Sequence, residues 1–319
     1  KNAYLTLLTR GSYLPGVIIL AHSLRKVGTR YPLIVAVTPS LPKACVDVLV
    51  AEGLRVEVVA AIVPVWATEK EGGKDGKRNR GAMVADRFED TWTKLVAFSH
   101  DDDDNDGATT IPMIPRRSMI PLTSPLQRIL LLDADLLLLH PLDPLFTLPL
   151  PSTHIAATPA CICNLDSQPW APIFWTPSNC AFTHYPPSPH PLSHHPHHPP
   201  PPLTPLPPPP TPTLNSGLLL LHPSLPLFSS LLTTIHTSPL SPTLQFPDQD
   251  LLSDVFRGKW WPLGWMWNAV KTMRYWHPGV WRDGSVRVVH YIVEKPWEVR
   301  RGEEGEDAVT VGWWWREWE

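Results

Sequence analysis

The stretch Arg128-Ile129-Leu130-Leu131-Leu132-Asp133-Ala134-Asp135 continues into four leucines, so two aspartates lie inside the longest apolar run, residues 129–139. A membrane-spanning helix needs about 20 apolar residues, and a carboxylate at mid-bilayer costs several kcal/mol. The run therefore excludes a membrane span. It predicts a buried strand over 129–133 that ends in acid, with a second short strand over 136–139.

The spacing of Asp133 and Asp135 indicates where ligands would bind. Residues two apart in an extended segment point to the same side, and the carboxyl ends of strands form the ligand edge of open α/β sheets. Two carboxylates aimed together need a cation, and oxygen ligands favour Mg²⁺ or Mn²⁺, which in turn hold phosphates. The alternative is a strand-end turn in which the aspartates cap a helix, and this motif alone leaves both open.

The rest of the chain alternates strands with helices. Expected strands cover residues 4–9, 33–37, 55–59, 218–221 and 286–291, and expected helices cover 14–25, 44–51, 225–235 and 248–256. This rhythm predicts an α/β fold built on a doubly wound, mostly parallel central sheet flanked by helices.

Composition narrows the class of protein. With 319 residues and 43% apolar residues, we expect a single domain over 1–319, and the net charge of −3 excludes a strongly basic nucleic-acid surface. Four cysteines are too few for a disulfide scaffold, and Cys161-Ile162-Cys163 is too tight for the usual zinc pair, so we interpret them as dispersed buried thiols. A strand begins almost at residue 1, so no signal peptide is expected and a cytoplasmic location is predicted; a lost upstream signal or anchor stays open.

Three segments interrupt the alternation of strands and helices, and a fourth lies after its last strand. Residues 69–81 and 99–125 are predicted to be solvated loop inserts, with polyanion contact for the first and calcium binding for the second as alternatives. Residues 183–213 contain a run with 15 prolines in 28 residues (186–213), together with His194, His195, His197 and His198, which predicts a polyproline-like or disordered insert. Metal binding by these histidines is the alternative. Residues 300–319 are expected to form a peripheral tail.

Several polar motifs accompany these elements. Asn215-Ser216-Gly217 opens a strand, Asp248-Gln249-Asp250 opens a helix, and His290 ends a strand five residues before Lys295. An imidazole can supply a metal ligand, and a lysine can contact phosphate.

Taken in order, these motifs resemble glycosyltransferase family 8, in particular its glycogenin-like and galactinol-synthase-like members of fungal type. The resemblance covers nearly the whole chain apart from the inserts. It is carried by residues 3–9, 91–95, 128–135, 215–217, 247–252, 286–291 and 295–297. It implies a GT-A fold, a UDP-hexose donor, Mn²⁺ (or Mg²⁺) and retention of anomeric configuration, by front-face attack or by double displacement.

The resemblance also implies residue roles. The metal ligands would be Asp133, Asp135 and His290, and the catalytic residues Lys94, Asp248 and Gln249. The nucleotide-sugar contacts would be Thr6, Leu7, Thr9, Tyr13, Lys94, Asp133, Ala134, Asn215, Ser216 and Lys295. The metal and Lys295 would neutralise charge on the leaving UDP, and Asp248 would stabilise the oxocarbenium-like sugar.

Two departures bear on the substrates. Arg10 stands where glycogenin-like sequences usually carry Asn, and Trp267 stands where relatives commonly carry Tyr. We therefore expect no self-glucosylation, but transfer to a small polyol or glycan acceptor, with a homodimer left open. Trp260, Trp261, Trp265 and Trp267 form either a sugar-stacking wall or ordinary core packing, which we favour.

Two other classes of function remain as alternatives. The first is a catalytically inactive binding or scaffold protein with the same fold. The second is a metal-dependent nucleotidyl- or phosphotransferase, which the lack of a Gly-rich phosphate loop disfavours.

Overall fold

The computed structural model describes residues 1–68, 81–99, 126–185, 211–302 and 304–319. The strands are β1 (Asn2–Leu8), β2 (Leu33–Val37), β3 (Arg55–Val58), β4 (Arg128–Leu132), β5 (Leu136–Leu138), β6 (Ile155–Pro159), β7 (Leu214–Leu221), β8 (Trp260–Pro262), β9 (Ala269–Val270) and β10 (Val288–His290). The α-helices are α1 (Leu14–Lys26), α2 (Lys43–Ala51), α3 (Val65–Thr68), α4 (Leu225–Thr237), α5 (Pro247–Val255), α6 (Met273–Trp276) and α7 (Ala308–Trp318). The 3-10 segment Asp86–Phe98, η2, also contributes to the core.

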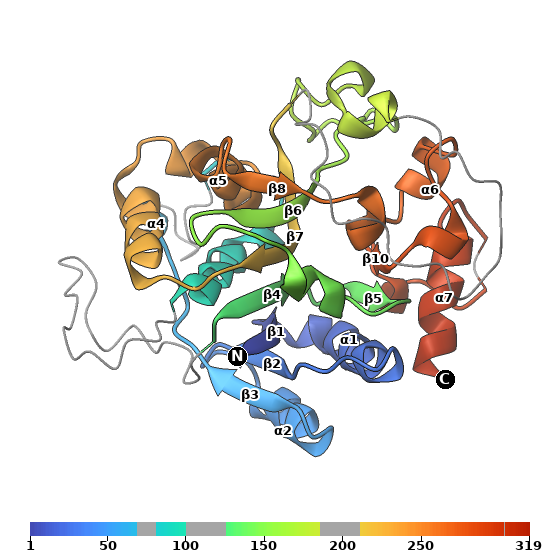
Figure 1. The fold of residues 1–319 in the computed structure, drawn as a ribbon, viewed down its shortest axis with the longest axis horizontal. Coiled ribbons are helices and arrows are strands. Elements are labelled where there is room, and N and C mark those ends of the chain that lie inside the picture. The colour runs from blue at the N-terminus through green and yellow to red at the C-terminus, as the bar shows by residue number, and fades with distance from the viewer. Residues whose placement is uncertain (69–80, 100–125, 186–210, 303) are drawn as a thin grey trace, which may run out of the picture.

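The main sheet has the strand order β3-β2-β1-β4-β7-β6-β8, and β7 alone runs against its neighbours. A second sheet has the strand order β5-β10-β9. It joins β5, which follows β4 directly in the chain, to two strands from the C-terminal part of the chain. Figure 1 shows the strands rising from β3 to β8, with α4 and α5 to one side and α1 and α7 to the other. The mixed, mostly parallel sheet confirms the predicted α/β class.

Side-chain alternation along the strands divides the core into two faces. One face carries Ile129 and Leu131 of β4 and packs against η2, α4 and α5. The other carries Leu130 and Leu132 and packs against α1 and β5. Successive residues of a strand point to opposite faces, so a run of leucines can supply both cores at once.

Three expectations differ from the structure or lie beyond it. Strands β6, β8 and β9 were not anticipated, and residues 69–80, 100–125 and 186–210 lie outside the described residues. The segment 300–319 is not merely a peripheral tail: it contains α7, in which Trp314 is 1% exposed, and Thr310 O accepts a hydrogen bond of 2.7 Å from Tyr291 Oη. Dispersion of the thiols is wrong for Cys161, Cys163 and Cys180, which lie together because β6, the segment after it and α6 meet.

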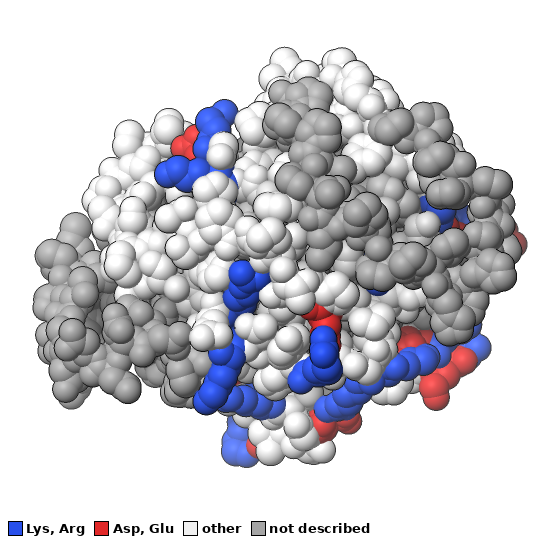
Figure 2. Space-filling view, viewed as in Figure 1, with Lys and Arg blue, Asp and Glu red and all other residues white. Residues whose placement is uncertain are grey.

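On the face seen in Figure 2, most of the described atoms belong to uncharged residues. Figure 2 shows charged side chains gathered over the lower part of this face, where β2, β3 and α2 lie in Figure 1. Oppositely charged residues are paired in this region, as in Lys43–Asp47 (2.6 Å) and Arg55–Glu57 (2.5 Å). Among the described helices, none has both the length and the apolar character needed to cross a bilayer.

Candidate active site

A cavity of about 540 Å³ lies at the carboxyl ends of β1 and β4. Because β7 runs antiparallel to β4, its first residues reach the same edge, and Asp133 N donates to Gly217 O at 2.8 Å. His290 reaches this edge from β10, where it pairs with Leu136 of β5. Motifs separated by more than a hundred residues therefore line one cavity.

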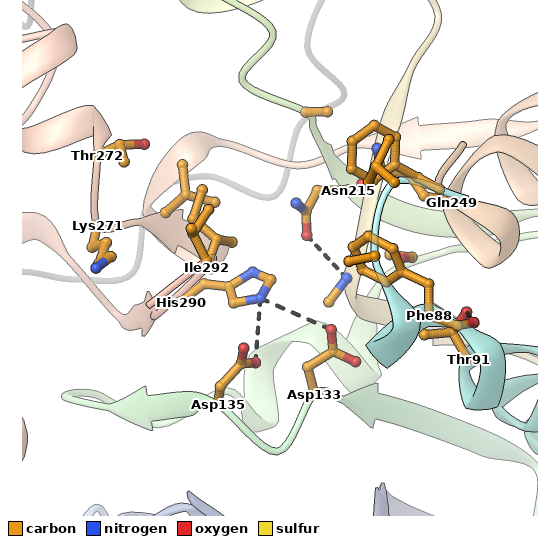
Figure 3. Close-up of a pocket in the computed structure, with 18 of the residues that line it drawn as sticks. Phe88, Thr91, Asp133, Asp135, Asn215, Gln249, Lys271, Thr272, His290 and Ile292 are labelled. Atoms are coloured by element: carbon orange, nitrogen blue, oxygen red, sulfur yellow. Dashed lines mark hydrogen bonds and ion pairs between the residues drawn. The ribbon is translucent and has the colours of Figure 1, made fainter. Parts of the chain in front are cut away.

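The three predicted metal ligands converge at the base of this cavity. His290 Nε2 lies 3.3 Å from Asp135 Oδ1 and 3.9 Å from Asp133 Oδ2 (Figure 3). One ligand atom from each of the three residues lies within 4.8 Å of the others. The structure thus brings together two carboxylates and an imidazole, the donor set expected around a divalent ion.

Two glycines permit this convergence. A Cβ on Gly217 would lie 2.3 Å from His290 Cε1, and one on Gly16 would lie 2.3 Å from the carbonyl oxygen of Ala134. Real Cβ atoms do not approach other heavy atoms so closely. Glycine is therefore required where β7 passes the imidazole and where α1 begins beneath the aspartate turn.

Lys295 holds the second aspartate in place. Its Nζ donates to Asp135 Oδ2 at 2.5 Å and to Tyr291 O at 2.8 Å, and lies 5.6 Å from the centre of the Tyr13 ring. Burial opposes ionisation of the Asp135 carboxyl, but the charges of Lys295 and His290 outweigh it and hold the pKa of Asp135 below its usual range. This carboxylate is therefore ionised at neutral pH.

Lys94 links Asp133, one of the three predicted metal ligands, to Asp248 of α5. Its Nζ lies 2.7 Å from Asp133 Oδ1 and 2.9 Å from Asp248 Oδ2, and its side chain is 12% exposed. Burial alone would disfavour the ammonium ion, but the two carboxylates outweigh burial and raise the pKa of Lys94. The lysine is thus a fixed positive charge between two acids, in the position predicted for a catalytic residue.

The remaining polar residues predicted for a sugar pocket also face the cavity. Asn215, Ser216 and Gln249 line it, as does Ala134 beside the aspartates. Asn215 Oδ1 accepts from Gly217 N at 2.9 Å and from Asn268 Nδ2 at 2.8 Å. Asn268, which is 3% exposed, was not predicted as a site residue, although it follows the departure at Trp267.

The predicted uracil and ribose wall is only partly placed on the cavity. Leu7, Thr9 and Tyr13 line it. Thr6 does not, because it lies inside β1 opposite Leu132 of β4 and is fully buried. Because side chains alternate along a strand, the side chain of Thr6 points into the core between the sheet and the helix. Thr6 is therefore not among the predicted nucleotide contacts that line the cavity.

Arg10, the residue that departs from the family pattern, has a partner that the sequence did not reveal. Its Nε lies 2.5 Å from Asp90 Oδ2 in η2, and its Nη2 donates to Asp86 O at 2.8 Å. Thr9 Oγ1 donates to the same Asp90 oxygen at 3.3 Å. This ion pair forms the rim of the cavity where the base is predicted to bind.

Aromatic side chains form another wall. Trp175 stacks on Phe246 with ring centres 4.9 Å apart and planes 8° apart, and Trp170 meets both edge-on. All three line the cavity, whereas Trp260, Trp261, Trp265 and Trp267 do not and instead pack in the hydrophobic clusters. The packing interpretation of those four tryptophans is therefore confirmed, and the stacking surface lies in a segment we did not single out.

Two polar residues between β9 and α6 were also missed. Lys271 Nζ pairs with Asp307 Oδ2 at 2.6 Å, and Thr272 Oγ1 is buried without a hydrogen-bond partner among the described residues. Figure 3 shows Lys271 and Thr272 across the cavity from Phe88 and Thr91. No motif indicates this set, because it depends on how the C-terminal segment returns to the sheet.

The triad fits a hard divalent cation. Asp135 Oδ1 is buried and accepts no hydrogen bond within the described part of the chain, so one carboxylate oxygen is available as a ligand. Carboxylate oxygens with one imidazole nitrogen suit Mn²⁺ or Mg²⁺. The donor chemistry therefore agrees with the ion that the sequence resemblance implies.

The chain is similar to known proteins in sequence and in fold. Galactinol synthase 1 of Arabidopsis thaliana is 27% identical over 321 residues, which cover 98% of this chain and 78% of the relative. The galactosyltransferase LgtC, solved with donor and acceptor sugar analogues, is 15% identical with a TM-score of 0.53, covering 99% of this chain and 95% of LgtC. The glycosyltransferase GlyE of Streptococcus pneumoniae is 14% identical with a TM-score of 0.54, covering 99% of this chain and 60% of GlyE.

The structural likenesses confirm the GT-A fold, while the fungal type stays a prediction. The model of the family described as "Glycosyl transferase family 8" matches residues 4–300, which include every motif at the cavity. A match over that much of the chain leaves one conclusion, that this protein belongs to glycosyl transferase family 8.

Proposed function

We propose that this protein transfers a hexose from a UDP-sugar to a hydroxyl group of a small polyol or glycan, with retention at the anomeric carbon and with Mn²⁺ (or Mg²⁺). The observation that supports this most is the convergence of Asp133, Asp135 and His290 within 4.8 Å at the base of a cavity. The same cavity contains the Lys94–Asp248 pair.

Asp133, Asp135 and His290 would hold the ion, which supplies positive charge to the diphosphate of the donor. Lys295 fixes the orientation of Asp135 through its 2.5 Å contact and adds a second positive charge near the leaving group. The ion and Lys295 would both lie where negative charge develops on the leaving UDP. Their positive charges would therefore stabilise the transition state of transfer more than they stabilise the bound donor.

Asp248 and Gln249 would act on the sugar side of the bond. Asp248 has a buried side chain, 5% exposed, and its Oδ2 accepts a hydrogen bond of 2.9 Å from Lys94 Nζ. A carboxylate beside the anomeric carbon stabilises an oxocarbenium-like transition state, and the amide oxygen of Gln249 adds a dipole of the same sign. This arrangement serves front-face attack as well as double displacement.

The acceptor would enter along the aromatic wall. The Trp175–Phe246 stack offers flat apolar faces next to the polar sugar pocket, which suits the C–H faces of a cyclic polyol or sugar. The relatives named galactinol synthases favour a polyol over a long glycan. Trp267, at the position where relatives commonly carry Tyr, is 2% exposed in the core, which supports a diffusible acceptor.

The test is UDP release with UDP-glucose, UDP-galactose or UDP-N-acetylglucosamine, Mn²⁺, and a panel of polyols and oligosaccharides. We expect turnover with one donor, and Asp135→Asn should lower Mn²⁺-dependent kcat/KM by at least about 100-fold. The variant should still fold, with a lower melting midpoint, because the amide oxygen can accept from Lys295 but the buried ion pair is lost. The matched control is Asp47→Asn on the exposed face of α2, which should keep full activity.

Two outcomes would overturn the proposal. Full Mn²⁺-dependent activity of Asp135→Asn would contradict the metal site. Binding of UDP without turnover of any donor, in the presence of every acceptor, would instead favour a non-catalytic binding protein.

A further inference from the structure

A second cluster of ligand-type side chains lies outside the Asp–Asp–His triad. Cys161 and Cys163 follow β6, Cys180 precedes the 3-10 turn Ala181–His184, and His277 follows α6. His277 Nε2 lies 3.2 Å from Cys163 Sγ, 3.3 Å from Cys161 Sγ and 3.9 Å from Cys180 Sγ. All four ligand atoms lie within 4.8 Å of one another.

These separations match a tetrahedral zinc site. Zinc–sulfur bonds of about 2.3 Å and zinc–nitrogen bonds of 2.0 Å, at tetrahedral angles, place neighbouring ligand atoms roughly 3.5–3.8 Å apart. The nitrogen–sulfur separations of 3.2–3.9 Å and the Cys161–Cys180 sulfur separation of 4.0 Å bracket that range. Three thiolates and an imidazole are the ligands that Zn²⁺ prefers, whereas Mn²⁺ and Mg²⁺ prefer oxygen.

A disulfide accounts for this arrangement less well. All four cysteines of the chain are unpaired. A disulfide between any two of the clustered sulfur atoms would not explain why the third thiol and the imidazole lie beside them. One nitrogen that faces three sulfur atoms from a separate segment is the geometry of ligands around a common centre.

Three of the four ligands are buried: Cys163 is 2% exposed, Cys180 is fully buried and His277 is 7% exposed. Cys161 is half-buried and lies at the wall of the active-site cavity. Apolar side chains of one hydrophobic cluster surround them, including Phe182, whose ring centre lies 5.9 Å from that of His277. Four protein ligands leave no open position for substrate, so the ion would stabilise structure.

We propose that Cys161, Cys163, Cys180 and His277 bind one Zn²⁺ ion that fixes the segment 160–185 to the end of α6. Binding converts the three thiols to thiolates, and their protons pass to solvent. This segment between β6 and β7 contains only short 3-10 turns among its described residues, so little regular backbone pairing holds it.

The segment supplies a wall of the active-site cavity. Asp166, Gln168, Trp170 and Trp175 all line it, and Trp276 Nε1 donates to Asp166 Oδ1 at 3.0 Å just before His277. The zinc ion would therefore set the position of the aromatic wall. Given the proposed transferase function, its loss should raise the KM for acceptor more than the KM for donor.

The test is the metal content of the full chain, purified without chelators or added zinc and measured by mass spectrometry of the elements. We expect one zinc per chain, and loss of that zinc in Cys163→Ser and in Cys180→Ser. Cys45→Ser is the matched control, because Cys45 lies in α2 outside the cluster and its replacement should leave the zinc content unchanged. Asp135→Asn should also keep the zinc, since it alters only the Asp–Asp–His site.

Cobalt substitution of the wild-type chain keeps the proposal testable if the cysteine variants do not fold. Co²⁺ bound to thiolates in a tetrahedral site should give intense sulfur-to-cobalt charge-transfer absorption. The proposal is overturned if the wild-type chain contains no zinc and takes up no cobalt with these bands. It is also overturned by an intramolecular disulfide in the mass spectrum, or by zinc that Asp135→Asn removes and Cys163→Ser retains.

Discussion

Replacement of Lys94 by methionine tests whether one buried ammonium ion holds the two halves of the active site together. Lys94 Nζ contacts Asp133 at 2.7 Å and Asp248 at 2.9 Å, and the side chains of Lys94 and Asp248 are 12% and 5% exposed. Methionine preserves most of the side-chain volume but removes the charge. Two neighbouring carboxylates would then repel each other without compensation.

The expected loss follows from this burial. Removing one partner of a buried ion pair costs about 3–5 kcal/mol, and we take the lower end because the side chain of Asp133 is 22% exposed. Asp248→Asn should cost only about 1 kcal/mol, since an amide oxygen still accepts from Lys94. The double variant should lose about 2 kcal/mol rather than the sum of both, because Asp133 then faces no second charge.

Urea denaturation of the four proteins measures this coupling, which should be about 2 kcal/mol. Lys43→Met is the control: Lys43 pairs with Asp47 on the surface of α2, and its loss should cost less than about 1 kcal/mol. Mn²⁺ should raise the melting midpoint of Lys94→Met more than that of the wild type, because the ion replaces the missing positive charge beside Asp133. Free-energy losses that add within about 0.5 kcal/mol would refute the reasoning.

Two further predictions address the close approach at Gly217 and the titration of Asp250. Gly217→Ala places a Cβ 2.3 Å from His290 Cε1, so the imidazole must move. The Mn²⁺ affinity measured by calorimetry should then fall by about tenfold or more. The control is Gly284→Ala, whose Cβ meets nothing within 4 Å and which should bind Mn²⁺ as the wild type does. Equal affinities would show that His290 is not a ligand. Burial raises the pKa of Asp250 to about 6, although its carboxylate accepts from Gln245 N and Phe246 N. The folded state then binds this proton more tightly than the unfolded chain, so the free energy of unfolding should fall by about 2 kcal/mol between pH 4 and pH 6. Asp250→Asn should remove that decrease in urea titrations, and an unchanged slope would contradict the assignment.

Much of the fold could be predicted from local patterns. The leucine run before Asp133, the apolar run 33–37 and the helical spacing over 14–25 each specify an element that the structure contains. Strands β6, β8 and β9 could not be found in this way. They have two to five residues, one of them is Trp-Trp-Pro, and pairing with neighbours rather than their own sequence makes them strands.

The residues of the candidate site also fall into two groups: those that sequence motifs reveal and those that only tertiary contacts reveal. Asp133 and Asp135 are recognisable because they follow the leucine strand β4, and His290 because it ends β10; the order of the motifs links them. Thr6 carries the right chemistry in the right motif, yet β1 points its side chain away from the cavity. Asp90, Asn268 and Lys271 stand outside the predicted set, and only their tertiary partners reveal what they contact.

By itself, the sequence determined the α/β class and the edge of the sheet where ligands would bind, because both follow from residue type and short-range periodicity. The set of two acids and one imidazole was implied by the family resemblance of the motifs. Tertiary structure alone decided which side chains enter the cavity and which are buried. It also decided that Cys161, Cys163 and Cys180 would lie around His277, although the thiols and the imidazole are up to 116 positions apart in the sequence. The reason is physical: local spacing sets the direction of a side chain within its own element, whereas proximity across the chain depends on how elements pack.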